Sequence, residues 1–278
     1  MRRRRKAEGA IGVVSRTSRT PHGRALALLA VVVLGLACSR RELAPPAPSA
    51  SASAIAAPSP AASSSAPPAP LPPAAVERIE VPGDRPAFVV RGADGTPPRA
   101  FFLAGICSNA YAYLLGFPEA ARQAGGVVAI DGDLPCPGMP DFRSLSGDPE
   151  KQHKRIEAAL AAAGTRPIPA DGITLIGSSL GATVAELLAS RYPERYTRIA
   201  IIASPRDPIA TMFRRTQSVV TMSCSRDVPW RMKSASKRIL ALGVPSLYVE
   251  MPGCTHGNLA HAEEKFSEVF SWLDAQGK

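Results

Sequence analysis

The sequence predicts an α/β fold, in which a mostly parallel sheet of eight strands has helices on both faces. Short apolar runs that do not alternate with polar residues recur from residue 76 onward, and helix-like segments lie between them. Such runs are typical of strands buried on both faces, and the helices between them are the crossovers that parallel strands require. About 203 residues follow position 75, enough for one such domain with a sizeable core.

Eight apolar runs are predicted to be strands. The first two, VERIEV and AFVVRG, are expected to form an antiparallel pair, and AFFLAG is expected to be a fully buried strand. In sheets of this class, ligands bind beyond the carboxyl ends of the strands, so the loops that leave the strands are where chemistry is expected. The predicted strands span residues 76–81, 87–92, 100–105, 126–131, 172–177, 196–204, 217–224 and 245–251.

Five segments between or after these strands are predicted to be helices. Gly125 and Gly126 mark the end of the first and Gly164 the end of the second, because glycine commonly stops a helix. The predicted helices span residues 110–125, 149–164, 180–192, 229–243 and 258–276.

The N-terminal segment has the layout of a secretory signal peptide. MRRRRK and further arginines up to Arg24 precede a 13-residue apolar run at 25–37, and Cys38 follows it. This run is shorter than the about 20 residues that a membrane-spanning helix needs. Residues 1–37 are therefore predicted to be a signal peptide that directs export. An uncleaved anchor or a wrongly assigned start codon is the alternative.

The net charge of +10 resides mostly in the N-terminal segment. Residues 1–43 hold 10 Lys and Arg against 2 Asp and Glu, which leaves the remainder of the chain close to neutral. A chain without a basic face gives no indication of a nucleic-acid partner.

The sequence LGLAC at 34–38 resembles the lipobox of bacterial lipoproteins, with Ala37 before Cys38. The match departs from the pattern at Gly35, where the lipobox usually has Leu. The resemblance implies that Cys38 is lipidated and tethers the protein to a membrane surface. Simple cleavage of the signal remains the alternative. The expected location is the cell envelope, at the periplasmic face of a bacterial membrane, or the medium after secretion.

The segment that follows Cys38 is predicted to be an extended tether. Of the 32 residues at 44–75, 13 are Ala, 10 are Pro and 7 are Ser, so the segment has too little apolar bulk to form a core. The expected organisation is a signal peptide at 1–37, a lipidated Cys38 with its tether at 38–75, and a globular domain at 76–278.

Residues 177–181, GSSLG, form a G-x-S-x-G pattern between a predicted strand and a predicted helix. That context is the nucleophile elbow, a tight turn that needs small residues two before and two after the nucleophile. Ser179 has Gly177 and Gly181 at those positions, whereas Ser178 does not. Ser179 is therefore the predicted nucleophile, and a helix-capping serine is the alternative.

With this elbow in place, residues 76–278 resemble the α/β-hydrolase superfamily, which places nucleophile, acid and base in that chain order. The resemblance implies that Asp227, in SRDVPW after the seventh strand, is the acid and that His256, in GCTHGN after the last strand, is the base. Asp207, in SPRDPI after the sixth strand, is the rival acid.

The other two histidines of the domain are not expected to take part in catalysis. His153 lies on a charged helical segment and His261 inside the closing helix, so both are expected to be solvated face residues.

The resemblance also implies an oxyanion hole made of two backbone N–H groups. One belongs to Leu180, the residue after the nucleophile, and the other to Ile106 in the loop after the third strand, with Cys107 as the alternative. The family often has His-Gly in that loop, and this chain has Ala104 and Gly105.

Family lids often lie between the sixth and seventh strands, where this chain has only about 12 residues at 205–216, so no large cap domain and an open site are expected. Some aromatic side chains are expected either to line the pocket or to belong to the core: Tyr111, Tyr113, Phe142 and Trp230. The arginines near the rim are expected to be mainly solvated: Arg206, Arg214, Arg215 and Arg226.

Four cysteines remain when Cys38 is set aside, and an even number in an exported protein favours disulfides. The sequence alone allows three pairings, or four buried thiols. The strand order of the α/β-hydrolase superfamily places the third strand beside the fourth and the seventh beside the eighth, which implies the pairs Cys107–Cys136 and Cys224–Cys254. Neither C-x-x-C nor paired-histidine spacing occurs, so no metal and no cofactor are expected.

The expected function is that of a serine hydrolase, of esterase or peptidase type, that forms an acyl-enzyme on Ser179. Its substrate would be a small-molecule or peptide acyl compound, and the sequence does not choose between ester, thioester and amide. The alternatives are a catalytically silent hydrolase fold that serves as a binding or scaffold lipoprotein, and a structural lipoprotein of the envelope.

Overall fold

The structure is a computed structural model that describes residues 73–93 and 95–277. The predicted signal peptide, Cys38 and the tether up to residue 72 lie outside the described residues. No helix within the described ranges is long and apolar enough to cross a membrane.

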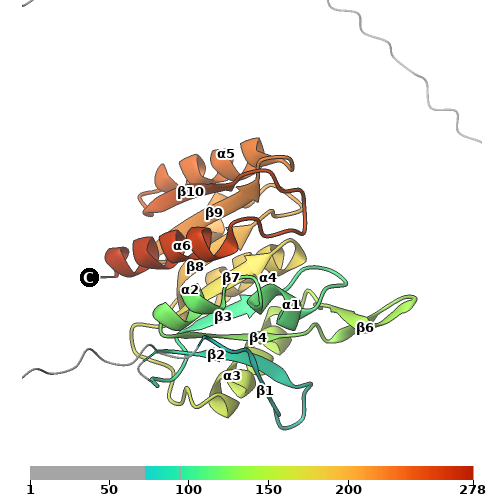
Figure 1. The fold of residues 1–278 in the computed structure, drawn as a ribbon. Coiled ribbons are helices and arrows are strands. Elements are labelled where there is room, and N and C mark those ends of the chain that lie inside the picture. The colour runs from blue at the N-terminus through green and yellow to red at the C-terminus, as the bar shows by residue number, and fades with distance from the viewer. Residues whose placement is uncertain (1–72, 94, 278) are drawn as a thin grey trace, which may run out of the picture. The chain divides into compact units, whose positions relative to one another are not determined.

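An eight-stranded sheet forms the centre of the domain, with strand order β1-β2-β4-β3-β7-β8-β9-β10 (Figure 1). β1 pairs antiparallel with β2, and β2 pairs antiparallel with β4, whereas all other neighbours in this sheet are parallel. The predicted antiparallel opening and the mostly parallel remainder are both confirmed. The strands are β1 (Glu77–Ile79), β2 (Ala87–Arg91), β3 (Ala100–Leu103), β4 (Gly126–Ile130), β7 (Ile173–Ser178), β8 (Tyr196–Ile202), β9 (Ser218–Cys224) and β10 (Ser246–Met251).

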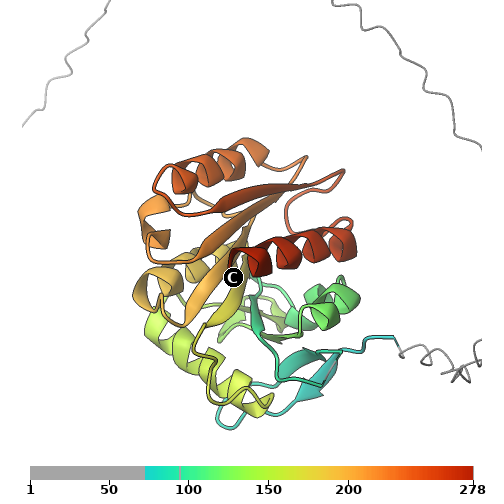
Figure 2. The ribbon, with the colours of Figure 1, turned by 90° about the vertical axis from the view of Figure 1, so that its left-hand side faces the viewer.

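Helices cover both faces of this sheet, as Figure 2 shows. One face packs against α3 (Pro149–Ala162), α4 (Leu180–Arg191) and α5 (Pro229–Leu240). The other face packs against α1 (Ala110–Leu114), α2 (Pro118–Gln123) and α6 (Ala262–Gln276).

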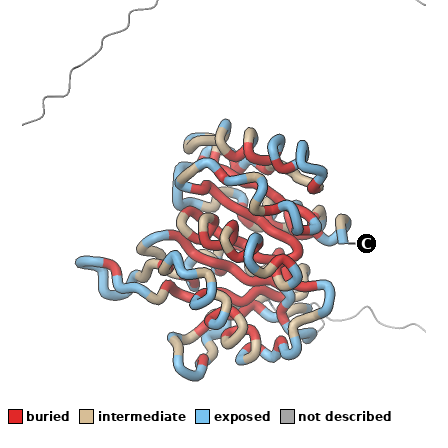
Figure 3. The backbone as a smooth tube through the Cα atoms, turned by 180° about the vertical axis from the view of Figure 1, so that it is seen from behind, coloured by how far each residue is buried: buried red, intermediate tan, exposed pale blue. Residues whose placement is uncertain are grey.

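The inner strands between these helix layers are buried almost throughout, whereas the edge strands β1 and β10 are more exposed (Figure 3). Phe101 and Leu103 of β3 point into one layer, and Phe102 between them points into the other. Alternation of this kind within a continuous apolar run explains why the sequence shows no polar face on the central strands.

Two predicted helices differ from the structure. The segment 110–125 forms two helices, because the chain turns at Gly116 and Phe117 and Pro118 then starts α2, a position that proline favours. The closing helix begins at Ala262 rather than at 258.

A second sheet was not predicted. β5 (Leu134–Cys136) and β6 (Met139–Ser144) form an antiparallel hairpin that projects from the end of β4 (Figure 1). Between β8 and β9 the chain adds only the short 3₁₀ helix η1 (Ala210–Phe213), so the described chain has no large cap there.

Candidate active site

Ser179 lies on a strained turn between β7 and α4. Its φ of 52° and ψ of −115° fall in a region that residues with a side chain seldom occupy, and such strain is concentrated at functional sites. The turn is held by hydrogen bonds from the Ser179 N–H to the Ile202 carbonyl and from the Ala182 N–H to the Ser179 carbonyl, at 2.8 and 3.0 Å.

Glycines on either side of Ser179 let the backbone pack closely. A Cβ atom on Gly177 would overlap the carbonyl of Gly181, and one on Gly181 would overlap the carbonyl of Leu103 in β3. Side chains at these two positions would therefore push strand and helix apart, which is the physical reason for the G-x-S-x-G spacing.

The structure brings the predicted nucleophile, base and acid together. Ser179 Oγ lies 2.9 Å from Nε2 of His256, and Nδ1 of His256 lies 2.9 Å from Oδ2 of Asp227. Ser179 is 7% exposed, whereas the His256 side chain is 45% exposed. Ser179 is therefore nearly buried, and the imidazole that contacts its hydroxyl is itself open to solvent.

The rival acid is placed elsewhere. Asp207 accepts a hydrogen bond from Nε of Arg231 at 3.1 Å, and Arg231 also donates to the carbonyl of Ser204. Of the two aspartates that the sequence left open, Asp227 is the one in contact with His256.

The other two histidines differ from each other. The expectation for His153 is wrong: its side chain is 14% exposed, Nδ1 lies 2.8 Å from the Tyr196 hydroxyl, and its ring stacks on Tyr192. Burial lowers the pKa of His153, although the Glu157 carboxylate opposes the shift. His261 is exposed, as expected, but it precedes α6 rather than lying within it.

The loops that hold Asp227 and His256 are joined to each other. The Cys224–Cys254 disulfide links the end of β9 to the loop after β10, and both cysteines are buried in the core. The N–H of Arg226 also donates to the carbonyl of Cys254 at 3.1 Å. Asp227 and His256 thus project from one cross-linked unit.

The loop after β3 lies close to Ser179. A Cβ atom on Gly105 would lie 3.3 Å from Cβ of Ser179, so Ile106 follows directly at the site. Cys107 has a φ of 47° and forms a disulfide with Cys136 of β5. The cysteines are joined in the pairs that the family resemblance implied.

The β5–β6 hairpin is attached to this loop by backbone as well. The N–H of Ser108 donates to the Arg143 carbonyl at 3.1 Å, and the Arg143 N–H donates back to the Ser108 carbonyl at 3.4 Å. Together with the disulfide, these bonds fix the hairpin beside the predicted oxyanion loop.

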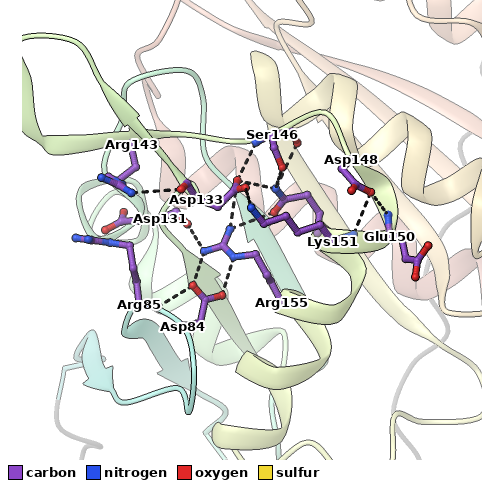
Figure 4. A network of polar contacts seen from close by, with 11 residues as sticks. Asp84, Arg85, Asp131, Asp133, Arg143, Ser146, Asp148, Glu150, Lys151 and Arg155 are labelled. Carbon is purple, nitrogen blue, oxygen red and sulfur yellow. Dashed lines mark hydrogen bonds and ion pairs between the residues drawn. The ribbon is translucent and has the colours of Figure 1, made fainter.

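A network of largely buried charged side chains supports the segment that follows β3 (Figure 4). Arg155 of α3 donates to both carboxylate oxygens of Asp84 and to the carbonyl of Asp131. The Asp131 carboxylate in turn accepts the N–H of Ala110 at 2.9 Å, at the start of α1. This series of contacts from Arg155 through Asp131 to Ala110 therefore helps to fix the start of α1, the helix that follows Cys107.

Asp133 is the second anchor of the network. Its carboxylate pairs with Lys151 at 2.7 Å and accepts hydrogen bonds from the N–H of Ser146 and the amide of Gln152. Burial acts to raise the pKa of Asp133, but these donors outweigh it and hold the pKa far below the usual range for aspartate. The carboxylate stays ionised and joins the base of the hairpin to α3.

The four aromatic candidates separate into lining and non-lining side chains. Tyr113 and Phe142 line a groove beside the site, and Tyr111 packs on Phe88 with ring centroids 5.4 Å apart. Trp230 is 63% exposed, so it does not belong to the core. Phe142 could be assigned only with knowledge of the hairpin, which the sequence did not reveal.

The four candidate arginines also differ. Arg206 pairs with the buried Glu186 of α4 at 3.3 Å, whereas the other three are exposed, namely Arg214, Arg215 and Arg226. Within the described ranges, no group of three or more His, Cys, Asp or Glu side chains is placed to hold a metal ion.

Comparison with known proteins is consistent with this arrangement. A family model described as "Putative esterase" matches residues 157–244, a segment that includes the elbow and Asp227. No curated protein matches the chain.

Solved structures resemble the whole described domain at low sequence identity. Carboxyl esterase 2 from Tuber melanosporum has a TM-score of 0.55 and 11% identity, with 75% of this chain and 88% of that chain covered. An esterase from Rhizomucor miehei has a TM-score of 0.53 and 13% identity, with 73% and 83% covered. A bacterial membrane phospholipase A has a TM-score of 0.51 and 17% identity, with 73% and 87% covered. At such identities the likeness is one of fold.

Proposed function

From the premise that the domain has the α/β-hydrolase fold, we propose that this chain is a serine hydrolase that cleaves carboxylic esters through an acyl-enzyme on Ser179. The single observation that supports it best is the contact series from Ser179 to His256 to Asp227, with 2.9 Å at each step. The match to the putative-esterase family model favours an ester over an amide or thioester.

The proposed first step is attack by Ser179 on the ester carbonyl. Nε2 of His256 takes the serine proton, and Asp227 accepts a hydrogen bond from Nδ1–H, which fixes the tautomer and stabilises the imidazolium. His256 then gives the proton to the alcohol that leaves. In the second half, His256 activates water to hydrolyse the acyl-enzyme and regenerate Ser179.

The charge that forms on the carbonyl oxygen needs backbone donors. We assign this role to the N–H of Leu180, which begins α4, and to the N–H of Ile106, which follows the close contact of Gly105 with Ser179. The positive end of the α4 dipole favours the same negative charge.

Export and tethering form the second part of the proposal. The signal-like segment and Cys38 motivate it, and two disulfides are typical of proteins that fold in oxidising compartments. Mass spectrometry of the mature N-terminus tests it. A diacylated Cys38 is the expected result, and an unmodified Cys38 or cleavage at another position contradicts it.

The catalytic proposal is tested with a fluorophosphonate probe, which reacts with activated serines. Wild type is expected to be labelled and to hydrolyse p-nitrophenyl esters, and Ser179→Ala is expected to lose both activities. Ser178→Ala is the matched control, because Ser178 is the adjacent buried serine at the end of β7 and should keep both. Folded wild-type protein that neither reacts nor hydrolyses any ester would instead support a binding or scaffold role.

A further inference from the structure

A groove of about 450 Å³ opens along the loop after β3, and its volume falls in the range of roughly 300–1,000 Å³ that is usual for ligand sites. It lies between the loop after β3, helix α1, the β5–β6 hairpin and the loop after β10. Its apolar and aromatic lining side chains include Ile106, Ala112, Tyr113, Phe142 and Leu259, and Ser108 and Asn109 are its polar lining residues.

The groove begins next to the predicted catalytic groups. Gly257, the residue after His256, forms part of its wall, and Ile106 follows Gly105, where an added Cβ would lie 3.3 Å from Cβ of Ser179. The Tyr113 hydroxyl lies near Gly105 and donates to the Gly257 carbonyl at 3.4 Å, so it joins the two sides at the inner end. Ser179 and His256 do not line the groove themselves, but a substituent on a carbonyl carbon bound to Ser179 could reach it past Gly105 and Gly257.

The walls of the groove match an uncharged apolar group. None of its lining residues carries a charged side chain. Ile106 is 62% exposed and Phe142 is 40% exposed, which leaves large apolar side chains facing solvent at the edge of the site. Covering these side chains with a hydrocarbon group would remove apolar surface from water.

The outer wall is rigid because the hairpin that holds Phe142 is cross-linked. The Cys107–Cys136 disulfide joins the hairpin to the loop of Ile106, and the Ser108–Arg143 backbone pair lies directly beside Phe142. Phe142 and Ile106 therefore line the groove from two segments that are tied to each other, which suits a wall that selects substrates by length.

We propose that this groove binds an uncharged apolar chain of the ester and that Phe142 of the β5–β6 hairpin determines which chain lengths are preferred. The inference rests on the proposed esterase function. The chain can belong to the acyl group or to the alcohol, since both are joined to the carbonyl that Ser179 attacks. Phe142 acts as a specificity residue through its contact with the chain.

Two ester series test the proposal. One keeps p-nitrophenol and lengthens the acyl group, and the other keeps acetate and lengthens the alcohol. In Phe142→Ala, the ratio of kcat/KM for the longest to the shortest ester should fall about tenfold in at least one series. The series that responds identifies which side of the ester enters the groove.

Met139→Ala is the matched control. Met139 lies on the same strand, is 42% exposed and does not line the groove, so the ratio should change less than twofold. A ratio that is unchanged in Phe142→Ala in both series, or that falls equally in Met139→Ala, overturns the proposal.

A binding measurement separates this proposal from the failure of the proposed function. N-phenyl-1-naphthylamine, an uncharged apolar fluorophore, should bind to Ser179→Ala protein, and its affinity should fall several-fold when Phe142→Ala is added but not when Met139→Ala is added. Equal affinities in all three proteins overturn the groove proposal even if wild type hydrolyses esters. A wild type without esterase activity that shows the expected affinities refutes the proposed function alone.

Discussion

The two loop pairs that flank Ser179 are each closed by a disulfide, yet they are built differently. On the side of Asp227 and His256, Cys224 and Cys254 are buried in the apolar core beneath the loops. On the side of Ile106, Cys107 is only partly buried, and the loop depends on the charged network around Arg155 and on the β5–β6 hairpin. The side of the proposed acid and base is thus supported by the apolar core, and the side of the proposed oxyanion loop by a largely buried network of ion pairs.

This difference suggests a division of tasks. If Asp227 and His256 act as proposed, they must keep one geometry for every substrate, and a support buried in the core suits that requirement. The side of the proposed oxyanion loop also forms the groove. One wall of this groove is the β5–β6 hairpin, which is separate from the main sheet and can change without disturbing it. We therefore expect substitutions on the acid–base side to affect the rate for all esters, and substitutions on the hairpin to affect the choice among esters.

The largest expected effect comes from breaking the acid–base side. Asp227→Asn should reduce kcat by about 10³–10⁴-fold, because an amide no longer selects the right imidazole tautomer or stabilises its charge. Asp207→Asn is the control, since Asp207 pairs with Arg231 and should stay within about twofold of wild type. Steady-state kinetics on one p-nitrophenyl ester measures both, and a larger loss in Asp207→Asn would reverse the assignment of the acid.

Removing each disulfide in turn compares how much the two loop pairs that flank Ser179 contribute to the unfolding free energy. Their sequence separations of 29 and 30 residues give nearly equal loop-closure terms, about 3.6 kcal/mol each at 25 °C. Cys107→Ala/Cys136→Ala should lose about that amount of unfolding free energy, and Cys224→Ala/Cys254→Ala should lose more, because it also leaves space in the core. Urea unfolding of the oxidised proteins measures the losses, and equal losses would remove the distinction drawn above.

The smallest expected effect concerns the ion pairs of the oxyanion side. At pH 7, Asp133→Asn should lose about 2 kcal/mol of unfolding free energy, because it removes a charged partner of Lys151, Ser146 and Gln152. The pKa of Asp133 is lowered in the folded state, so its stabilising contribution is present above the unfolded pKa of about 3.9 and is lost as the pH falls below it.

The gap between wild type and Asp133→Asn should therefore be constant from pH 7 to about pH 5 and narrow below about pH 4. Urea unfolding at pH 7, 5 and 3 measures it. Asp141→Asn, an exposed aspartate on β6, is the control and should change stability by less than about 0.5 kcal/mol. A gap that widens in acid would show that Asp133 does not act as an ionised anchor.

Regular patterns in the sequence predicted most of the fold. The eight strands of the main sheet follow from apolar runs whose burial on both faces leaves no alternation, and the elbow follows from glycines at two fixed positions around Ser179. The hairpin was missed because LPCPGMPDFRS contains three prolines, which argue against a strand. The signal that was present is the two-residue Pro137–Gly138 turn between the paired Cys136 and Met139.

Side-chain roles that depend on packing were harder to predict. His153 occupies a charged helical segment, and only the contacts with Tyr192 and Tyr196 of neighbouring elements show that it is mostly shielded from solvent. Phe142 is adjacent in sequence to polar residues, and its place in the groove depends on the cross-link between the hairpin and the loop after β3. Both depend on contacts between segments distant in the chain, which no local pattern encodes.

The position of His256 after β10 has a consequence for biosynthesis. The strained serine turn belongs to the middle of the chain, whereas the imidazole that would activate it is made 77 residues later. A chain leaves the ribosome or an export channel with its N-terminus first. A partly emerged chain would therefore contain Ser179 before His256 is available to it. Under the proposed mechanism the protein would stay chemically silent until its last strand has joined β9, which would protect the compartment where it is synthesised from premature ester cleavage.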